Sequence, residues 1–555
     1  MPVLQPMERL MLISLRRTLL VVFLAVAAFA LSHQPSVAQE STTAVASEVR
    51  NLLAEGAKLE EGKRWSEAIR HYESALRTHP QQSEFVQRVE LARVHLDLGR
   101  RYHDRSFIES LAQMTPNESS SLYADILLKI QSHYVHSPDW QDLVRRGILN
   151  LDVALTESVF LNHHFQQVDL VAIDRFRRSL RELYRIHPAN DYRRASEVAN
   201  LIAETAKRDL GLNHSTVMAE FTSGAAGGLD TYSAYLTGHQ LSEVFSQIEG
   251  NFVGLGVELK TEEHRLHIVN VIPGGPAAEG GVRGGQTILA VDGQAVAQIS
   301  PDAAADMLKG EEGSSVTLTL GNPNGQAQQV RLVRKRVDVP SVVDVSILDQ
   351  ENGIGYLRVT SFQKTTTRDI DNALWDLHRQ GMRSLIFDVR GNPGGLLTAS
   401  VEIADKFIST GTIVSTRGRS SAEDYDYRAH SVGTWRVPLI VLIDGDSASA
   451  SEIFAGAIRD HQRGQVIGQR SYGKGSVQGI FPMDRYHVGV RLTTAKFYSP
   501  SGQPISDRGV TPTIAVPVQQ LTAKPNDAGQ LVAATTHDAV LRTGLQVARD
   551  QLSRR

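Results

Sequence analysis

The sequence has no cysteine among its 555 residues. Disulfide bonds, thiol nucleophiles and cysteine-ligated metal sites are therefore excluded. The net charge is only −3 and no long basic run occurs, so nucleic acid is a poor candidate for a partner. The sequence also has no phosphate-binding loop and no clustered spacing of metal ligands, and nothing in it calls for a cofactor.

The sequence does contain enough residues for several domains. A chain of 555 residues is too long for one hydrophobic core and indicates three or more units. Its 41% hydrophobic and 21% charged residues are ordinary for a soluble globular protein.

The N-terminus has the pattern of an export signal. Arginines precede the apolar stretch Thr18–Leu31, and Ser36-Val37-Ala38 supplies small residues at the cleavage positions. We predict a signal peptide over residues 1–38, with export to the periplasm or another extracytoplasmic compartment. An uncleaved membrane anchor is the alternative, because apolar residues also lie before the arginines.

Residues 45–112 have the pattern of a helical repeat. One tetratricopeptide-like repeat is indicated by the spacing of Gly56, Ala68, Tyr72, Ala75 and Pro80. A single repeat cannot bury its own apolar face, so this segment must dock on another surface. It is either an arm that binds an adaptor protein or an ordinary helical hairpin that covers the next domain.

A helical region over residues 119–248 is followed by a β-rich domain over residues 249–337. Composition changes sharply at Gly250, where glycine becomes frequent and short β-runs alternate with turns. This segment resembles a PDZ domain. The resemblance is carried by Phe252–Val257, by Gly275–Gly293 and by the strand Val316–Leu320.

The PDZ resemblance implies that an extended peptide adds a strand to the sheet. In that mode, the N–H groups of a glycine-rich loop hold the terminal carboxylate of the peptide. The loop expected to do this contains Val253, Gly254, Leu255 and Gly256. The alternative is a small β-domain that only supports its neighbour.

Apolar strands and amphipathic helices alternate over residues 338–520, which indicates a layered α/β domain. A further amphipathic helix is expected within residues 535–555. The central stretch has a strand at Leu439–Ile443, a small-residue turn, and a helix from Glu452 to Asp460. Such a strand–turn–helix arrangement exposes a side chain next to the N–H groups at a helix start.

Three serines lie in that turn, and one lysine follows them. We predict that Ser449 is a nucleophile and that Lys474 is its base, since a serine hydroxyl needs a base within hydrogen-bond reach. Ser447 and Ser451 are the competing nucleophiles. The alternative for Ser449 is a purely structural role, because Ser449-Ala450-Ser451-Glu452 fits a capping box. A triad with His461 is disfavoured, because a histidine at a helix end usually interacts with the helix dipole.

Residues 227–516 resemble the carboxyl-terminal processing proteases, also called tail-specific proteases. The matching pieces are Gly228-Leu229-Asp230 with Tyr235-Leu236, the PDZ segment, Gly355–Phe362, Leu385–Leu397 with its Asn-Pro-Gly-Gly turn, Ser447–Asp460, Gly473–Gln478, Leu492–Lys496 and Pro500-Ser501-Gly502. The resemblance implies a ClpP/crotonase-like layered α/β core, a PDZ domain and an N-terminal all-α region. It also implies a serine endopeptidase that cuts near protein C-termini with a Ser–Lys dyad.

Carried over to this sequence, the family pattern makes Ser449 the nucleophile, Lys474 the general base and Gln478 the orienting partner. Lysine acts as a base only when it is neutral, and burial favours the neutral form. An oxyanion also needs fixed donors. The expected donors are the backbone N–H of Ala450 and those of Gly394 or Gly395.

A non-catalytic PDZ and repeat scaffold with a vestigial protease core is the alternative function. The expected partners of the enzyme are proteins or peptides bound by their C-termini. The N-terminal arm and the C-terminal helix are candidate surfaces for homo-oligomer formation. Membrane association is expected only if the signal segment stays uncleaved.

Overall fold

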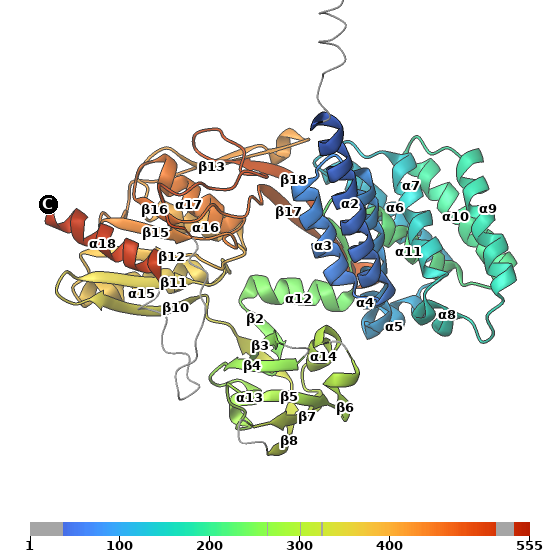
Figure 1. Cartoon of the computed structure of the whole chain (residues 1–555), viewed down its shortest axis with the longest axis horizontal. Helices are drawn as coiled ribbons and strands as arrows, with labels where there is room; N and C mark the ends of the chain where they lie inside the picture. Colours follow the sequence, from blue (N-terminus) through green and yellow to red (C-terminus); the bar gives the residue numbers. More distant parts are fainter. Residues whose placement is uncertain (1–36, 263–264, 300, 323–325, 518–537, 555) are drawn as a thin grey trace, which may run out of the picture. The chain divides into compact units, whose positions relative to one another are not determined.

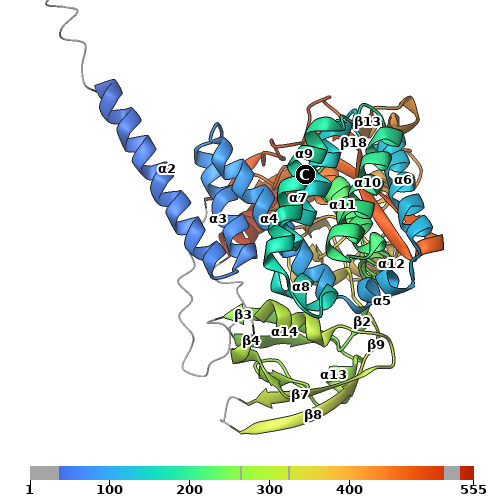
Figure 2. The same ribbon diagram turned by 90° about the vertical axis from the view of Figure 1, so that its right-hand side faces the viewer.

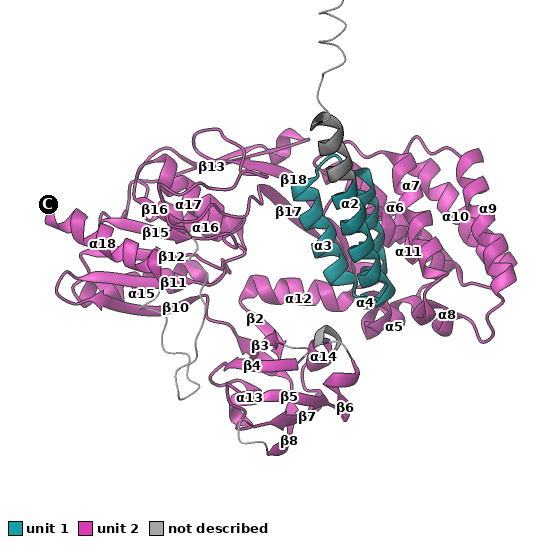
Figure 3. Ribbon diagram, viewed as in Figure 1, with its two compact units in different colours: residues 1–100 teal, residues 101–555 magenta. Residues whose placement is uncertain are grey.

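The computed structural model describes residues 37–262, 265–299, 301–322, 326–517 and 538–554. The predicted signal peptide lies outside these residues up to position 36. Within the described ranges, no helix is long and apolar enough to cross a membrane. The described residues form two compact units, one within residues 1–100 and one within residues 101–555 (Figure 3).

The first unit contains helices that pack as a hairpin followed by a third helix. These are α2 (Val37–Glu61), α3 (Trp65–Thr78) and the first part of α4 (Ser83–His103). Gly56 of α2 meets the buried ring of Tyr72, and a Cβ at Gly56 would lie only 2.2 Å from that ring. The small residue therefore permits the close approach of two helices. The hairpin is observed, and its assignment as a tetratricopeptide repeat stays a prediction.

The second unit begins with a helical region. Its helices are α5 (Arg105–Gln113), α6 (Pro116–His133), α7 (Trp140–Ala154), α8 (Ser158–His164), α9 (Leu170–Ile186), α10 (Tyr192–Leu210) and α11 (His214–Gly227). Helix α11 is buried along nearly its whole length, and α6, α7 and α10 pack around it.

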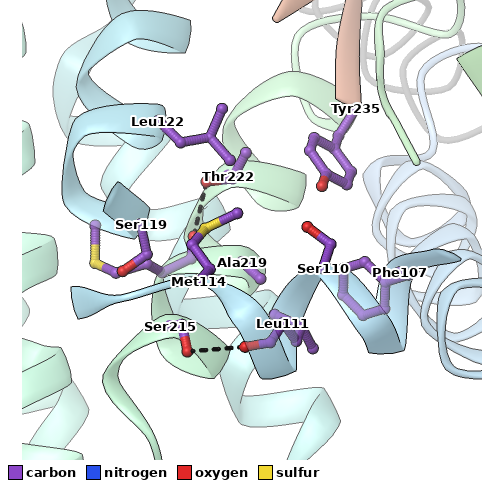
Figure 4. A pocket seen from close by; sticks show the side chains of 11 residues that line it. Phe107, Ser110, Leu111, Met114, Ser119, Leu122, Ser215, Ala219, Thr222 and Tyr235 are labelled. Atoms are coloured by element: carbon purple, nitrogen blue, oxygen red, sulfur yellow. Dashed lines mark hydrogen bonds between the residues drawn. The ribbon is translucent and has the colours of Figure 1, made fainter. Parts of the chain in front are cut away.

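A small pocket lies between α5, α6 and α11 (Figure 4). Its walls are mainly apolar, with Phe107 and Leu111 from α5 and Tyr235 from the short strand β1 (Ala234–Leu236). No charged side chain lines this pocket, so its position and composition do not suggest a catalytic site.

Helix α12 (Gly238–Glu249) leads into the β-rich domain, whose core is formed by one sheet and two short helices (Figures 1 and 2). The strand order is β3-β4-β5-β7-β8, and β6 pairs with β5. The bounds are β3 Val257–Glu262, β4 Arg265–Val271, α13 Pro276–Glu279, β5 Thr287–Val291, β6 Gln294–Ala295, α14 Pro301–Leu308, β7 Ser315–Gly321 and β8 Ala327–Val333.

The segment that enters the β-rich domain pairs with the segment that leaves it. Strand β2 (Asn251–Gly254) pairs antiparallel with β9 (Lys335–Asp338). The loop Leu255-Gly256 then turns the chain into β3, which lies at the edge of the main sheet. The segment Phe252–Val257, which carries part of the PDZ resemblance, therefore contains the end of one strand, a turn and the start of the next strand.

The C-terminal domain is a layered α/β structure built on a sheet with strand order β10-β11-β12-β15-β16-β19. In this sheet β11, β12, β15, β16 and β19 are parallel to one another, and β10 is antiparallel to β11. The bounds are β10 Val342–Asp349, β11 Ile354–Val359, β12 Ser384–Asp388, β15 Leu439–Ile443, β16 Gln465–Gly468 and β19 Ile514–Ala515.

Helices cover both faces of this sheet (Figure 1). One face packs against α15 (Thr366–Arg379), α16 (Leu397–Asp405) and α17 (Ala450–Asp460). The other face packs against α18 (Ala539–Ser553), the C-terminal helix predicted from the sequence. Because both faces are buried, the central strands are apolar throughout, as expected for a parallel sheet.

A second sheet connects the helical region to the C-terminal domain. Its order is β1-β18-β13-β14, and β17 pairs with β18. The bounds are β13 Thr412–Gly418, β14 Tyr425–Arg428, β17 Ser476–Met483 and β18 Val488–Tyr498. Lys474 lies just before β17, and Ser449 lies just before α17.

Candidate active site

Ser449 stands at the turn between strand β15 and helix α17 with a strained backbone. Its φ is 54° and its ψ is −111°, a conformation that residues with a Cβ rarely adopt. Such a conformation costs on the order of 1–3 kcal/mol and is typical of functional sites. The turn therefore keeps a serine where glycine would be the less strained residue.

The two neighbouring serines have structural roles. Ser447 is fully buried, and its hydroxyl donates to the carbonyl of Val389 at 2.8 Å. Ser451 is fully buried as well, and its hydroxyl donates to the carbonyl of Asn392 at 3.0 Å. Ser449 is half-buried. Of the three hydroxyls, only that of Ser449 remains without such a carbonyl acceptor among the described residues.

The Glu452 half of the capping box read from the sequence is present at this turn. The carboxylate of Glu452 accepts the N–H of Ser449 at 2.7 Å. The N–H of Glu452 lies 2.9 Å from the carbonyl oxygen of Ser449, which supplies that donor with an acceptor on the main chain. The Ser449 side chain makes no cap hydrogen bond itself. Capping by Glu452 is therefore compatible with a hydroxyl that is available for chemistry.

Glu452 joins the serine turn to the lysine segment. Its fully buried carboxylate accepts from Ser471 Oγ at 2.6 Å, from Gly473 N at 2.7 Å and from Lys474 N at 2.9 Å, in addition to Ser449 N. Burial raises the pKa of Glu452, and these four donors oppose that rise. Sequence reasoning recognised Glu452 only as a capping residue, because its other donors lie about twenty residues further along the chain.

Replacing Glu452 by glutamine is expected to reduce both stability and activity. An amide has one acceptor oxygen in place of two, and its NH₂ group would face N–H donors. We expect a loss of about 1–3 kcal/mol in the free energy of unfolding and a lower kcat. Denaturant unfolding and a cleavage assay on the same preparation would measure the two effects. Unchanged values of both would contradict the linking role of Glu452.

Lys474 is half-buried, and its ammonium has an aromatic neighbour. Burial lowers the pKa of Lys474, the positive charge of Arg491 lowers it further, and Glu452 opposes both effects. The Nζ atom lies 4.8 Å from the centroid of the Tyr232 ring. Within the described structure, no hydrogen bond joins Nζ to Ser449 Oγ. Glu452 thus bonds to the main chain of both Ser449 and Lys474, and the Nζ atom of Lys474 lies over the Tyr232 ring.

Gln478 lies on strand β17 close to Lys474 in the sequence. Its Nε2 donates to the carbonyl of Ser476 at 3.1 Å and to the Ser476 hydroxyl at 2.9 Å. The register of β17 against β18 shifts between Val477 and Gln478, which changes the direction of the side chain relative to a regular strand. The structure therefore places the Gln478 amide on Ser476 and not on Lys474.

The Asn-Pro-Gly-Gly turn packs directly against the serine turn. The buried Asn392 accepts the N–H of Ala448 on its carbonyl at 3.0 Å. A Cβ at Gly394 would lie 2.8 Å from the Ala448 carbonyl oxygen and 2.8 Å from Ser449 Cβ. Only glycine fits at this close approach, so the turn lies beside the position that the reacting carbonyl would occupy.

The three expected oxyanion donors differ in availability. The N–H of Gly394 donates to Asn392 Oδ1 at 2.9 Å and is therefore already used. The N–H groups of Gly395 and Ala450 have no acceptor among the described residues. Ala450 is the first residue of α17, where a helix N–H has no partner within the helix.

His461 lies at the opposite end of the helix that follows Ser449. Helix α17 has 11 residues, so roughly 17 Å separates its two ends. The Nε2 of His461 is 2.7 Å from the carbonyl oxygen of Thr412. A histidine triad with Ser449 is thus incompatible with the geometry.

The residues expected to bind a peptide terminus begin at β2. Val253 and Gly254 pair with β9, so these two belong to a ladder and not to an open loop. Leu255 and Gly256 form the turn that follows, and Gly256 has a φ of 75°. Among the described residues, no acceptor is present for the N–H groups of Leu255 and Gly256. The available donors therefore lie in the second half of the predicted loop.

Comparison with known proteins agrees with this arrangement. Residues 353–516 match the model of peptidase family S41, and residues 267–320 match the model of a PDZ domain. The chain is 37% identical over 301 residues to a carboxy-terminal-processing protease of Bartonella bacilliformis, which covers 53% of this chain and 68% of that protein.

A second relative and one solved structure carry similar names. The chain is 32% identical over 297 residues to a carboxyl-terminal-processing protease of Picosynechococcus sp., which covers 53% of this chain and 71% of that protein. A structure of a photosystem II D1 C-terminal processing protease matches 72% of this chain and 93% of its own, with 24% identity and a TM-score of 0.39.

Proposed function

Because the chain belongs to the carboxyl-terminal-processing protease family, we propose that it hydrolyses peptide bonds with Ser449 as nucleophile and Lys474 as general base. Family membership makes the protein a serine-type peptidase and sets aside a scaffold without catalysis. The observation that carries the choice of residues is the strained Ser449 joined through Glu452 to the segment of Lys474.

The proposed reaction starts with neutral Lys474. Its Nζ takes the proton of Ser449 Oγ, and Oγ attacks the carbonyl carbon of the substrate. The lysine then gives the proton to the leaving amine, and water completes the hydrolysis of the acyl-enzyme. Burial and Arg491 favour the neutral amine that the first step needs. Because Nζ lies on the Tyr232 ring in this structure, the side chain must shift toward Ser449 before that step.

The oxyanion would be held by backbone donors. We assign this role to the N–H groups of Ala450 and Gly395, since the N–H of Gly394 is bonded to Asn392. A donor at a helix start also benefits from the helix dipole. In the family pattern Gln478 orients the lysine, which requires its amide to leave Ser476 when the site is engaged.

Recognition of the substrate tail is assigned to the PDZ domain. Strand β3 lies at the edge of its sheet, and among the described residues it pairs on one side only, with β4. An extended peptide can add to the open side of β3, and the N–H groups of Leu255 and Gly256 can hold its terminal carboxylate. Such a site binds a free C-terminus and not an internal sequence.

Blocking the carboxylate of a substrate is therefore expected to weaken its cleavage. We expect C-terminal amidation of a cleavable peptide to raise KM by about tenfold or more, because a charge-assisted hydrogen bond contributes roughly 1.5–3 kcal/mol. Steady-state kinetics on the acid and the amide of one peptide would measure this. A peptide amidated only on an internal glutamate side chain is the matched control, and equal KM values for acid and amide would contradict the assignment.

The remaining proposals rest on the sequence. Export follows from the pattern of residues 1–38, and adaptor binding follows from the hairpin of α2 and α3. Homo-oligomer formation would use the N-terminal arm or α18. Membrane association would require that the signal segment stay uncleaved.

A further inference from the structure

Tyr232 is held in place by hydrogen bonds at both its main-chain N–H and its main-chain carbonyl. Asp230 Oδ1 accepts the N–H of Tyr232 at 2.8 Å and the N–H of Ser233 at 2.7 Å. The carbonyl of Tyr232 accepts from Arg491 Nε at 2.7 Å. These bonds fix the turn from which the Tyr232 ring reaches the lysine.

The same turn is fixed to the sheet that carries the lysine. Strand β1 follows Tyr232 and pairs antiparallel with β18, with Ala234 opposite Arg491. The N–H of Thr493 donates to Ser233 Oγ at 3.2 Å. Strand β17, which follows Lys474, pairs with the other side of β18. Ring and ammonium are thus attached to opposite sides of one strand, which sets their separation.

The protonation state of Tyr232 determines which part of the side chain attracts the ammonium of Lys474. Glu452 and Arg491 act on Lys474 with opposite sign. Burial raises the pKa of Tyr232 to about 12, and Tyr472, Asp507, Glu452 and Asp230 all act in the same direction. The phenol is therefore neutral when the enzyme works, and the attraction comes from the negative face of the ring and not from a phenolate.

We infer that Tyr232 is a positioning residue for Lys474: the face of its ring holds the ammonium form beside the serine turn. Once the ammonium has lost a proton to solvent, the neutral amine leaves the ring and takes the proton of Ser449. This inference rests on the proposed role of Lys474 as base. Nζ is 4.8 Å from the ring centroid and makes no hydrogen bond to Ser449 in the described structure. The role assigned to the ring is exerted through the lysine.

The inference has a measurable consequence for the proton on Lys474. A ring face stabilises the charged amine, so weakening that face should make Lys474 lose its proton at lower pH. Phenylalanine at position 232 keeps the ring, whereas 3,4,5-trifluorophenylalanine keeps its shape and removes most of the negative potential. We expect the pKa of Lys474 to fall by roughly 0.5 to 1 unit from the first variant to the second.

Competitive labelling with acetic anhydride over a pH series measures that pKa in the full chain. The label on the Lys474 peptide is quantified by mass spectrometry, so the measurement does not require an active enzyme. The kcat/KM profile is the second readout, and its acid limb should move to lower pH by the same amount. Tyr232→Phe should keep the parent profile. A third variant, Tyr232→Leu, removes the ring altogether and should shift the pKa in the same direction as the fluorinated ring.

Equal Lys474 pKa values in the phenylalanine and trifluorophenylalanine variants would overturn the inference. So would a shift produced by Tyr425→Leu, the matched loss of an exposed tyrosine on strand β14. The labelling separates this inference from the proposed function. If Lys474 is not the base, the labelling pKa still falls while the activity profile stays in place; if only the ring contact is wrong, the labelling pKa does not move.

Discussion

Replacing Ser449 by alanine is expected to lower kcat/KM by at least about three orders of magnitude, because no other group can form the acyl-enzyme. The neighbouring hydroxyls of Ser447 and Ser451 are buried and donate to carbonyls, so they cannot substitute for it. Binding of a substrate tail should persist, since the PDZ loop is a separate site. Cleavage followed by mass spectrometry, with tail binding measured on the same variant, tests both statements.

Ser451→Ala is the matched control for this experiment. It also removes a serine hydroxyl from the turn, but the lost hydrogen bond to Asn392 is structural. We expect about 1 kcal/mol of lost stability and measurable activity. Activity of Ser449→Ala close to that of the parent chain would contradict the assignment of the nucleophile.

The backbone strain at Ser449 can be tested with a second substitution at the same position. Glycine adopts positive φ without steric cost, so Ser449→Gly should unfold at a higher temperature than Ser449→Ala, although both are inactive. The expected difference is on the order of 1 kcal/mol in the free energy of unfolding. A lower stability of the glycine variant would show that the turn is not strained as its dihedral angles indicate.

The layered arrangement of the C-terminal domain could be predicted from the sequence, because its signals are local. The apolar runs of β11, β12 and β15 are short and closed by turn residues, and the helices between them have clear amphipathic periods. Helix α11 lies within the predicted helical region 119–248, but its own bounds were not predicted. Nearly all of its residues are buried, so it has no polar face and no amphipathic period to read.

In the candidate active site, too, local patterns predict some features and tertiary structure determines the others. The serine turn was predicted from a local strand–turn–helix pattern. Ser449 and Lys474 were chosen from their spacing, from the glycines beside the lysine and from the family resemblance. The contact of Tyr232 with Lys474 joins residues that are 242 positions apart, which follows from 474 − 232, and depends on the pairing of β1 with β18. Such pairings depend on tertiary structure, so no local sequence pattern predicts them.

The sequence also does not predict the direction in which a single side chain points. Gln478 was expected on the lysine, but a register shift in β17 lets its amide bond to Ser476. Gly394 was expected to be an oxyanion donor, but its N–H is taken by the side chain two residues earlier. In both cases residue type and spacing fitted the role, and the competing partner was a close neighbour in the chain.

Replacing Lys474 by methionine or by arginine is expected to lower kcat/KM by at least about two to three orders of magnitude, comparable to the loss of a general base. Methionine fills a similar volume but cannot accept a proton. Arginine keeps the positive charge but stays protonated in proteins, so it cannot act as a base either. If the charge of Lys474 alone stabilised the transition state, arginine would rescue activity and methionine would not. Cleavage assays on the two variants separate these roles.

The pH dependence of the parent chain should have a definite sign. The base form of a lysine is the neutral amine, so kcat/KM should rise with pH through the pKa of Lys474 and level off above it. Burial and Arg491 lower that pKa, so the rise in kcat/KM should occur at a pH below the usual range for lysine.

Lys129→Met is the matched control, because Lys129 also lies over an aromatic ring, that of Phe481, at 5.5 Å and far from the serine turn in the sequence. It should keep both the rate and the pH profile. A parent profile that falls with increasing pH through this range would mean that the ammonium form of Lys474 is the active one, and the dyad would then have to be abandoned.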